Sequence, residues 1–389
     1  MKKLISILGS TGSVGLTTLK VVEKNNSFKI NLLSANKNFK LINNQIKKYK
    51  PNYFIINNYA IFKKIDKKFK NKKIKIFNKF DNKVIKKKSD ITVAAIPGLS
   101  GLLPTLKMIK LSKKILIANK EAIICGWDLI KKEISKYNSK IIPIDSEHFS
   151  ISKLIENHNI DEIKKIYITA SGGPFLNYNY QKLKKIKAKD ALKHPKWKMG
   201  KKITIDSSTL MNKILEIVEA QKLFNVPENK IEIIIHPESL VHAIIKFKNG
   251  LSKFLYHETT MIIPIVNAIF DKEVDIEKYY VKDRQNKNDI KDLTFQTVNE
   301  KIFPIIRIKR RSNEYPSTSI IINASNEILV DLFLQKKIPF LGISKTIMRI
   351  LDDRNYKKYA IRKPKNINEI VEIDNWARNK TLKILDQNV

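Results

Sequence analysis

The amino-acid sequence predicts an α/β protein with a parallel sheet at its N-terminus, a mixed α/β region in the middle and a helical domain at its C-terminus. Short β-rich runs alternate with amphipathic stretches over residues 1–145, which is typical of a parallel sheet with helices on both faces. A glycine-rich loop follows the first of these runs. Helical periodicity dominates from residue 306 to the end of the sequence.

Six runs in the N-terminal region have the composition of buried strands. Each run is rich in β-branched and other apolar residues, and helix-like segments separate most of them. The six strands are expected at residues 4–8, 29–35, 53–56, 90–96, 114–119 and 140–145. They predict one parallel sheet.

The rest of the chain divides by its pattern into a mixed region, a polar stretch and a helical tail. The mixed region predicts strands at 164–170 and 230–236 and a long helix at about 208–223. Residues 281–305 are polar and poor in periodicity, so we expect a linker there. The predicted domains are therefore 1–145, 146–280 and 306–389, joined across the linker 281–305.

Length and composition indicate a soluble globular protein. The chain has 389 residues, which is enough for two or three domains. Its apolar runs stay well below the roughly 18 residues of a membrane span, so we expect no membrane partner. The apolar run at the start is too short for a signal peptide. The single cysteine, Cys125, cannot form an internal disulfide, so we expect a cytoplasmic location.

The formal net charge of +38 comes mostly from lysines that are spread along the whole chain. Even the densest basic stretch, residues 63–88, has no aromatic-stacking pattern and no finger motif. We therefore do not expect nucleic acid as a partner. A positive field would still speed the capture of anionic, phosphorylated ligands.

The loop after the first predicted strand has the sequence GSTGSVG, with Gly9, Gly12 and Gly15 at intervals of three. Glycine lets the backbone turn sharply and approach a pyrophosphate, while the N-terminus of the following helix offers free N–H groups. The loop therefore predicts a Rossmann-like dinucleotide-binding domain. A plain tight turn is the alternative, because the spacing differs from the commonest form of this motif.

The end of the second predicted strand indicates which nicotinamide cofactor binds. NAD-preferring folds usually carry an acid there, which holds the ribose 2′-hydroxyl. This sequence has no Asp or Glu between Glu23 and Asp66, and it supplies Asn36, Lys37 and Asn38 instead. A cation and amides suit a 2′-phosphate, so we predict NADPH as the cofactor.

Two carboxylates, Asp145 and Glu147, follow the last predicted strand of the first domain. If strand geometry continues, residues two apart point the same way and these acids converge. Paired carboxylates serve as acid and base or hold a hard divalent cation, and a shared cation relieves their repulsion more easily. A third ligand close to these two carboxylates would favour the cation site over the acid–base pair.

The segment DSSTLMNKILEIVEA, residues 206–220, offers candidates for that ligand and for a phosphate site. We expect a helix that begins at Asp206 and Ser207 and carries Asn212 and Glu216 on one face, beside Lys213. A second glycine-rich loop, SGGPF at 171–175, is suited to wrapping an anion. An ordinary capped helix with solvated polar residues remains the alternative at this point.

Seven motifs occur in an order that is similar to the 1-deoxy-D-xylulose 5-phosphate reductoisomerase family. They are GSTGSVG, ANKE (118–121), PIDSEH (143–148), SGGPF, HPKWKMG (194–200), DSSTLMNK with the downstream Glu216, and HPESLVH (236–242). The resemblance covers nearly the whole chain. It implies an enzyme that converts 1-deoxy-D-xylulose 5-phosphate to 2-C-methyl-D-erythritol 4-phosphate for isoprenoid biosynthesis, with NADPH and Mg²⁺ or Mn²⁺.

The same resemblance implies a homodimer of three-domain subunits, with a Rossmann-like domain, an α/β connective catalytic domain and a C-terminal α-helical domain. It also implies the site residues, each of which matches a position of a family motif. The implied metal ligands are Asp145, Glu147 and Glu216. The implied catalytic residues are these three with Lys120 and His194. The implied substrate contacts are Lys120, Ser146, Glu147, Ser171, His194, Trp197, Ser207, Asn212, Lys213 and Glu216. The implied NADPH contacts are Thr11, Gly12, Ser13, Val14, Asn36, Lys37, Asn38, Asn119, Glu121 and Gly200.

His194 and Trp197 resemble part of a mobile lid that closes over the substrate and excludes water. Two positions depart from the family pattern: Asn36 and Ile214 stand where glycine is common. The first departure concerns the contact to the ribose, and the second adds bulk beside Lys213.

Two other classes of function compete with this interpretation. A different NADP-dependent dehydrogenase of this architecture, such as one that acts on a semialdehyde, would need no metal. A binding or sensor protein, or a nucleic-acid binder that uses the lysines, would show no turnover and steep salt dependence of binding.

Overall fold

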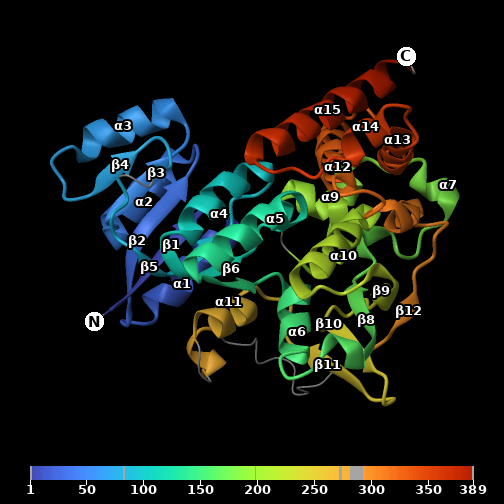
Figure 1. Cartoon of the computed structure of the whole chain (residues 1–389), viewed down its shortest axis with the longest axis horizontal. Coiled ribbons are helices and arrows are strands. Elements are labelled where there is room, and N and C mark those ends of the chain that lie inside the picture. Colours follow the sequence, from blue (N-terminus) through green and yellow to red (C-terminus); the bar gives the residue numbers. More distant parts are fainter. Residues whose placement is uncertain (1, 82–83, 198, 271–273, 281–291, 388–389) are drawn as a thin grey trace. The chain divides into compact units, whose positions relative to one another are not determined.

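The computed structural model describes residues 2–81, 84–197, 199–270, 274–280 and 292–387 (Figure 1). The chain forms two compact units. The first unit comprises Met1–Ala122, Trp127–Phe149 and Thr260–Asp289, and the second comprises Ile123–Gly126, Ser150–Thr259 and Ile290–Val389.

The first unit contains a seven-stranded sheet in the order β4-β3-β2-β1-β5-β6-β7, in which every neighbouring pair is parallel. Its strands are β1 (Lys3–Leu8), β2 (Phe28–Ala35), β3 (Tyr53–Ile56), β4 (Lys75–Phe77), β5 (Ser89–Ala94), β6 (Ser112–Ile117) and β7 (Lys140–Pro143). The six predicted strands and the parallel sheet are confirmed. The short edge strand β4 was not predicted.

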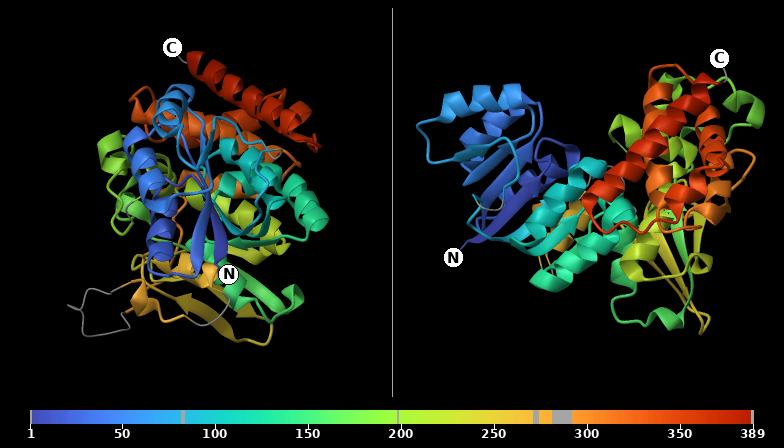
Figure 2. Two further views of the ribbon diagram at one scale, coloured as in Figure 1. Left: turned by 90° about the vertical axis from the view of Figure 1, so that its left-hand side faces the viewer. Right: turned by 45° about the horizontal axis from the view of Figure 1, so that its top comes forward.

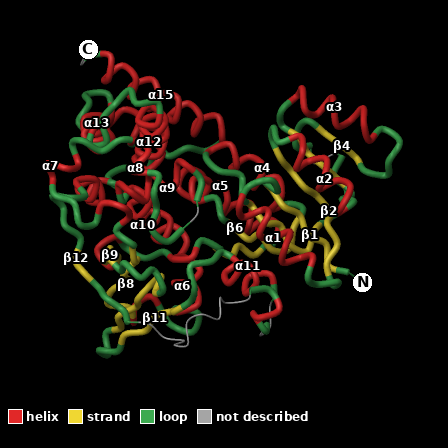
Figure 3. The backbone as a smooth tube through the Cα atoms, turned by 180° about the vertical axis from the view of Figure 1, so that it is seen from behind, coloured by secondary structure: helices red, strands yellow, loops and turns green. Residues whose placement is uncertain are grey.

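Helices connect these strands, as Figure 3 shows in red around the yellow strands β1, β2 and β4. The connecting helices are α1 (Ser13–Glu23), α2 (Phe39–Tyr49), α3 (Tyr59–Phe69), α4 (Leu102–Ile109) and α5 (Lys120–Tyr137), while α6 (Ser146–Leu154) and α11 (Ile262–Ile269) come later in the chain than β7. The strand order changes direction between β1 and β5, which is the place where doubly wound sheets bind their ligands.

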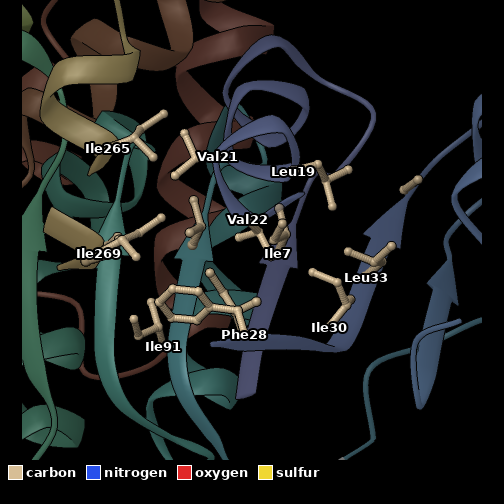
Figure 4. Packing of buried hydrophobic residues seen from close by; sticks show 14 of the residues in the cluster. Ile7, Leu19, Val21, Val22, Phe28, Ile30, Leu33, Ile91, Ile265 and Ile269 are labelled. Carbon is tan, nitrogen blue, oxygen red and sulfur yellow. The ribbon is translucent and has the colours of Figure 1, made fainter. Parts of the chain in front are cut away.

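The helix α11 belongs to the core of the first unit. Ile265 and Ile269 are fully buried in one cluster with Ile7 of β1 and Val21 of α1. Figure 4 shows Ile265 beside Val21 and Ile269 near Phe28. The pattern analysis placed this segment with the domain 146–280, but the structure places it on the first sheet. Its apolar face is complementary to that sheet, which distance along the chain does not reveal.

The second unit contains a mixed five-stranded sheet in the order β11-β10-β8-β9-β12, with only β8 and β9 parallel. Its strands are β8 (Ile163–Ala170), β9 (Ile231–Ile235), β10 (Val241–Phe247), β11 (Ser252–Tyr256) and β12 (Gln296–Thr297). Part of the expected linker, residues 281–291, lies outside the described residues. Its described part includes β12, which pairs with β9 and so joins the sheet.

The predicted helix at 208–223 is two helices. The helices between β8 and β9 are α7 (Tyr180–Leu183), α8 (Ala188–Ala191), α9 (Lys201–Thr209) and α10 (Met211–Phe224). Leu210 separates α9 from α10 because its backbone is left-handed, with φ 65° and ψ 11°. The expected helix start at Asp206 and Ser207 is therefore wrong, since both residues lie inside α9.

The C-terminal region is helical, as predicted. Its helices are α12 (Thr318–Leu334), α13 (Gly342–Leu351), α14 (Tyr356–Ala360) and α15 (Ile367–Asp386), and Figure 2 shows α15 in red beside α12 in orange. Single turns of 3₁₀-helix occur at Leu99–Gly101, Ile160–Glu162, Gly173–Phe175, Glu228–Lys230 and Ile276–Lys278, and a longer one at Pro304–Arg311. None of the helices in the described ranges is long and apolar enough to span a membrane.

Candidate active site

The glycine loop lies at the carboxyl end of β1 and begins α1. Gly9 has φ +80°, and a Cβ atom there would lie 2.6 Å from the carbonyl oxygen of Ala95. A Cβ atom on Gly15 would collide with the carbonyl oxygen of Gly9, so α1 packs tightly on the loop. Gly12 precedes α1 and meets only that same oxygen, at 3.4 Å. The loop thus keeps a backbone surface open at the helix N-terminus, as a pyrophosphate requires.

Buried hydrogen bonds hold this loop in place. Ser10 Oγ lies 2.7 Å from Oε1 of Gln45, and Gln45 Nε2 donates to the Ser10 carbonyl at 2.8 Å. The two residues connect the loop to α2, which follows the carboxyl end of β2. Thr11, Ser13 and Val14 lie at the surface or partly exposed on this loop.

The predicted 2′-phosphate residues follow β2, the strand beside β1. Asn36, Lys37 and Asn38 are exposed there. Asn38 begins α2, and its Oδ1 atom accepts a hydrogen bond from the Leu41 amide at 3.1 Å. The cation and the amides therefore lie at the same edge of the sheet as the glycine loop. Asn36, the departure from the family pattern, is solvent-exposed and does not disturb the core.

Asn119 fixes the loop after β5 to the start of α5. Its Oδ1 atom accepts from the Ala122 amide at 3.0 Å, and its Nδ2 atom donates to the carbonyls of Ile96 and Gly98 at 2.5 and 3.1 Å. Glu121 is buried in the first turn of α5. Their side chains shape the sheet edge, and their contacts to NADPH stay predictions.

Asp145 is at the centre of a charged group in the first unit. Its Oδ2 atom lies 3.4 Å from Lys120 Nζ, its Oδ1 atom lies 3.4 Å from His148 Nδ1, and carboxylate oxygens of Asp145 and Glu147 lie within 4.8 Å of each other. Burial disfavours the charged carboxylate, but the charge of Lys120 and the hydrogen bond to His148 hold the pKa of Asp145 well below its usual range.

The two carboxylates converge for a different reason than the sequence predicted. β7 ends at Pro143 and α6 begins at Ser146, so Asp145 and Glu147 flank the start of a helix rather than extend a strand. The Glu147 amide lies 3.4 Å from Asp145 Oδ1, and Ser146 Oγ donates to Glu147 Oε2 at 2.5 Å. The strand argument is therefore wrong, although the convergence is confirmed.

His194 joins two serines in the second unit. Its Nε2 atom lies 3.2 Å from Ser171 Oγ and 3.1 Å from Ser207 Oγ. Its Nδ1 atom accepts hydrogen bonds from the amides of Lys196 and Trp197 at 3.1 and 2.9 Å. Nε2 therefore carries the proton of the neutral ring. Burial, followed by the charge of Lys213, lowers the pKa of His194 to about 4.

The start of α10 carries a buried polar group, as the helical spacing predicted. Lys213 Nζ donates to Glu216 Oε2 at 2.8 Å, and Asn212 Nδ2 donates to the other oxygen of Glu216. All three side chains are buried, and buried charges are stable only when they are paired. Ile214 is fully buried, so its bulk belongs to the core rather than to a position that a ligand can reach.

Trp197 contacts a pair of histidines on the second sheet. Its ring meets His242 edge-on at 6.2 Å, and His242 stacks on His257 at 3.9 Å. Burial lowers the pKa of His257. Gly200 precedes α9, and a Cβ atom there would meet nothing within 4 Å. His236, His242 and His257 are all buried.

The predicted residues thus form two sets. The first unit holds the NADPH candidates apart from Gly200, together with Lys120, Asp145, Ser146 and Glu147, and the second unit holds Ser171, His194, Trp197, Gly200, Ser207, Asn212, Lys213 and Glu216. Sequence reasoning favoured a packing or hydrogen-bonding role for His148, which lies beside Asp145, but it missed Asn326 beside Asp206. No local signal separates Asn326 from the other polar residues of α12, such as Asn323 and Ser325.

Three family models match the chain. The model of 1-deoxy-D-xylulose 5-phosphate reductoisomerase matches residues 5–126, its C-terminal domain model matches 141–224, and the DXP reductoisomerase C-terminal domain model matches 257–380. The reductoisomerase of Pelagibacter ubique is 46% identical over the full length of both chains. That of Wolbachia pipientis wMel is 38% identical over 100% of this chain and 99% of its own.

Solved structures agree with these relatives. The reductoisomerase of Zymomonas mobilis in complex with NADPH has a TM-score of 0.89, 29% identity and 99% coverage of both chains. A reductoisomerase in complex with NADPH, fosmidomycin and magnesium has a TM-score of 0.89 at 28% identity, with 99% of this chain and 98% of the other covered. The chain belongs to the 1-deoxy-D-xylulose 5-phosphate reductoisomerase family.

Proposed function

We propose that the chain converts 1-deoxy-D-xylulose 5-phosphate to 2-C-methyl-D-erythritol 4-phosphate, with NADPH and a divalent cation, in isoprenoid precursor biosynthesis. The observation that carries this proposal is the full-length match to relatives named for this reaction. The solved relatives with bound NADPH and magnesium support the choice of cofactors. The buried polar groups described above supply the chemistry that such a reaction needs.

Asp145, Glu147 and Glu216 would hold the divalent cation. Carboxylate oxygens are the ligands that Mg²⁺ and Mn²⁺ prefer, and the low pKa of Asp145 keeps that group ionised at neutral pH. Asn212 and Lys213 each donate a hydrogen bond to one carboxylate oxygen of Glu216. These two hydrogen bonds fix the orientation of the Glu216 carboxylate. When bound, the cation polarises the carbonyl and hydroxyl oxygens of the substrate.

Ser171, Ser207, Asn212, Lys213 and His194 would bind the substrate's phosphate. The ammonium of Lys213 supplies the positive charge, and the other four residues supply polar groups. His194 is neutral with its proton on Nε2, so it donates a hydrogen bond toward the place where the two serine hydroxyls meet. An anchored phosphate provides binding energy that can be used at the reacting carbons.

The other residues would act at the reacting end of the substrate. Lys120, Ser146 and Glu147 would contact its oxygenated carbons, where charge develops during retro-aldol cleavage and re-addition. The rearrangement leaves an aldehyde, and hydride from NADPH with a proton from solvent reduces it to the alcohol. Trp197 would cover the intermediate and exclude water.

NADPH would bind along the carboxyl edge of the first sheet. The pyrophosphate would approach the backbone at Thr11, Gly12, Ser13 and Val14, where the loop is open. Asn36, Lys37 and Asn38 would receive the 2′-phosphate. Asn119, Glu121 and Gly200 would complete the contacts to the rest of the cofactor.

The test is NADPH oxidation by the purified chain with 1-deoxy-D-xylulose 5-phosphate as substrate. We expect turnover with Mg²⁺ or Mn²⁺, loss of turnover after exhaustive chelation, and recovery when the cation is returned. Unchanged activity after chelation would contradict the metal mechanism. Turnover of a semialdehyde but not of the sugar phosphate would favour a different dehydrogenase.

The proposed assembly is a homodimer in a reducing cytoplasm. β11 is an edge strand of the second sheet, and Leu251 and Phe254 beside or on it are 61% and 50% exposed, as an interface with a second copy would explain. The buried thiol of Cys125, the single cysteine of the sequence, fits a reducing compartment. Light scattering should give twice the mass of 45.1 kDa, and Phe254→Asp should shift it toward the monomer.

A further inference from the structure

We propose that Asn326 is a positioning residue for the substrate's phosphate, because its amide in α12 holds the Asp206 carboxylate and so fixes the turn of α9 that presents Ser207. The inference rests on the proposed role of Ser207 as a phosphate ligand. Because Asn326 lies in α12, the C-terminal helical region would then contribute to substrate binding.

The contact is a buried hydrogen bond between distant parts of the second unit. Asn326 Nδ2 donates to Asp206 Oδ1 at 2.7 Å, across 120 residues of sequence. Asn326 is fully buried and Asp206 is 2% exposed. The second oxygen of Asp206 accepts from Lys202 Nζ at 3.0 Å, one turn earlier in α9. Both oxygens of this carboxylate are therefore held by donors from two different helices.

A buried carboxylate in the middle of α9 needs a reason. Helix formation does not favour aspartate at an interior position, and a buried charge is costly unless its partners satisfy it. Asp206 directly precedes Ser207, whose Oγ atom lies 3.1 Å from His194 Nε2. A shift of this turn would carry Ser207 away from His194 and from the start of α10.

The same turn is constrained from the glycine-rich loop as well. A Cβ atom on Gly173 would lie 3.2 Å from Ser208 Cα and 3.3 Å from the Ser207 carbonyl oxygen. Beyond Ser207, Thr209 Oγ1 accepts from the Met211 amide at 3.2 Å, next to the left-handed Leu210. The loop, the break and the hydrogen bond to Asn326 together define where the Ser207 hydroxyl lies relative to Asn212 and Lys213.

Simple stabilisation of the fold is the competing explanation, and steady-state kinetics separates the two. Asn326→Ala should lower kcat/KM for 1-deoxy-D-xylulose 5-phosphate about tenfold, mainly through a higher KM, because a misplaced phosphate ligand weakens binding. The KM for NADPH should stay within about twofold of the unmodified chain. The inhibition constant of inorganic phosphate, as competitor of the substrate, should rise in parallel.

The matched control is Thr318→Val on the same helix. Thr318 is fully buried, and its Oγ1 atom lies 2.6 Å from the hydroxyl of Tyr356 and accepts from the Tyr315 amide at 3.1 Å, so this variant also loses side-chain hydrogen bonds of α12. It should lower Tm as Asn326→Ala does, but it should leave the KM for the sugar phosphate unchanged. Equal effects of both variants on that KM would overturn the proposal.

A reciprocal exchange tests the contact itself. Asn326→Asp places a second carboxylate against Asp206, and it should damage substrate binding more than Asn326→Ala. Adding Asp206→Asn to this variant restores the hydrogen bond in the opposite direction, because the new amide at position 206 can donate to the new carboxylate at position 326. The amide oxygen at position 206 can still accept from Lys202. The double variant should recover most of the KM, and failure to recover with a folded protein would also overturn the proposal. If Ser207→Ala leaves the KM and phosphate inhibition unchanged, the proposed phosphate site fails instead.

Discussion

His194 and Ser207 form a contact in which the imidazole is the donor, with Nε2 3.1 Å from Oγ. The backbone amides of Lys196 and Trp197 occupy the other ring nitrogen, and that arrangement selects the tautomer. Because the ring stays neutral near pH 7, it can offer a hydrogen bond to a phosphate without changing its charge when substrate binds.

The first prediction concerns the protonation of His194. The folded pKa of about 4 lies below the ordinary 6.5, so the unfolded chain binds more protons between these values. The contribution of His194 to stability is therefore present above about pH 6.5 and is lost as pH falls toward 4. NMR titration of the ring signals, assigned with His194→Gln, should find no midpoint for His194 between pH 5.5 and 8. A titration midpoint near pH 6.5 would contradict the lowered pKa of His194.

The second prediction concerns the carboxylates. Asp145→Asn and Glu216→Gln should each lower kcat by about 10²-fold or more, because each removes a charge that would hold the cation. The dissociation constant of NADPH, measured by its fluorescence, should stay near that of the unmodified chain. The control is Glu156→Gln, an exposed acid on a surface pair, which should change neither value. Matching losses of cofactor affinity would indicate misfolding rather than chemistry.

The third prediction concerns the glycine loop. In Gly15→Ala the new Cβ atom would lie 2.7 Å from Ser10 Cα, so the loop backbone must shift, at a cost of roughly 1–3 kcal/mol. The KM for NADPH should rise at least about tenfold. Gly250→Ala is the control, because Gly250 has a positive φ but nothing within 4 Å of its Cβ position. It should reduce Tm slightly and leave the KM for NADPH unchanged.

The fourth prediction concerns cofactor choice. Lys37→Ala should raise the KM for NADPH about tenfold and leave the KM for NADH nearly unchanged, since only the former carries a 2′-phosphate. Lys40→Ala, an exposed lysine in the first turn of α2, should have little effect on either. Equal KM and kcat values with both cofactors in the unmodified chain would contradict the NADPH preference.

Local patterns predicted much of this protein. The runs 4–8 and 90–96 are rich in apolar and β-branched residues, and the spacing of Asn212 and Glu216 places them one helical turn apart, so neighbouring residues suffice to predict the strands and the shared helix face. β4 was missed because three residues in a lysine-rich stretch carry too little pattern. The break at Leu210 was missed because leucine rarely adopts a left-handed backbone, and only tertiary packing stabilises it there.

The partners of distant segments could not be predicted in the same way. Asn326 meets Asp206 across 120 residues, and α11 packs on a sheet that ends more than 100 residues earlier in the sequence. A single polar side chain can form a hydrogen bond with many partners, and a single apolar helix face can pack on many apolar surfaces. The choice among them depends on the shapes of complete units, which single-sequence periodicity does not contain.

The return of α11 to the first sheet has a consequence for synthesis on the ribosome. A truncated fragment that stops at residue 149 lacks Ile265, Val266 and Ile269. The apolar surface that these side chains cover would therefore be exposed to water. The first unit therefore cannot complete its core until translation has passed α11, and a fragment that ends after β7 should be insoluble when it is expressed alone.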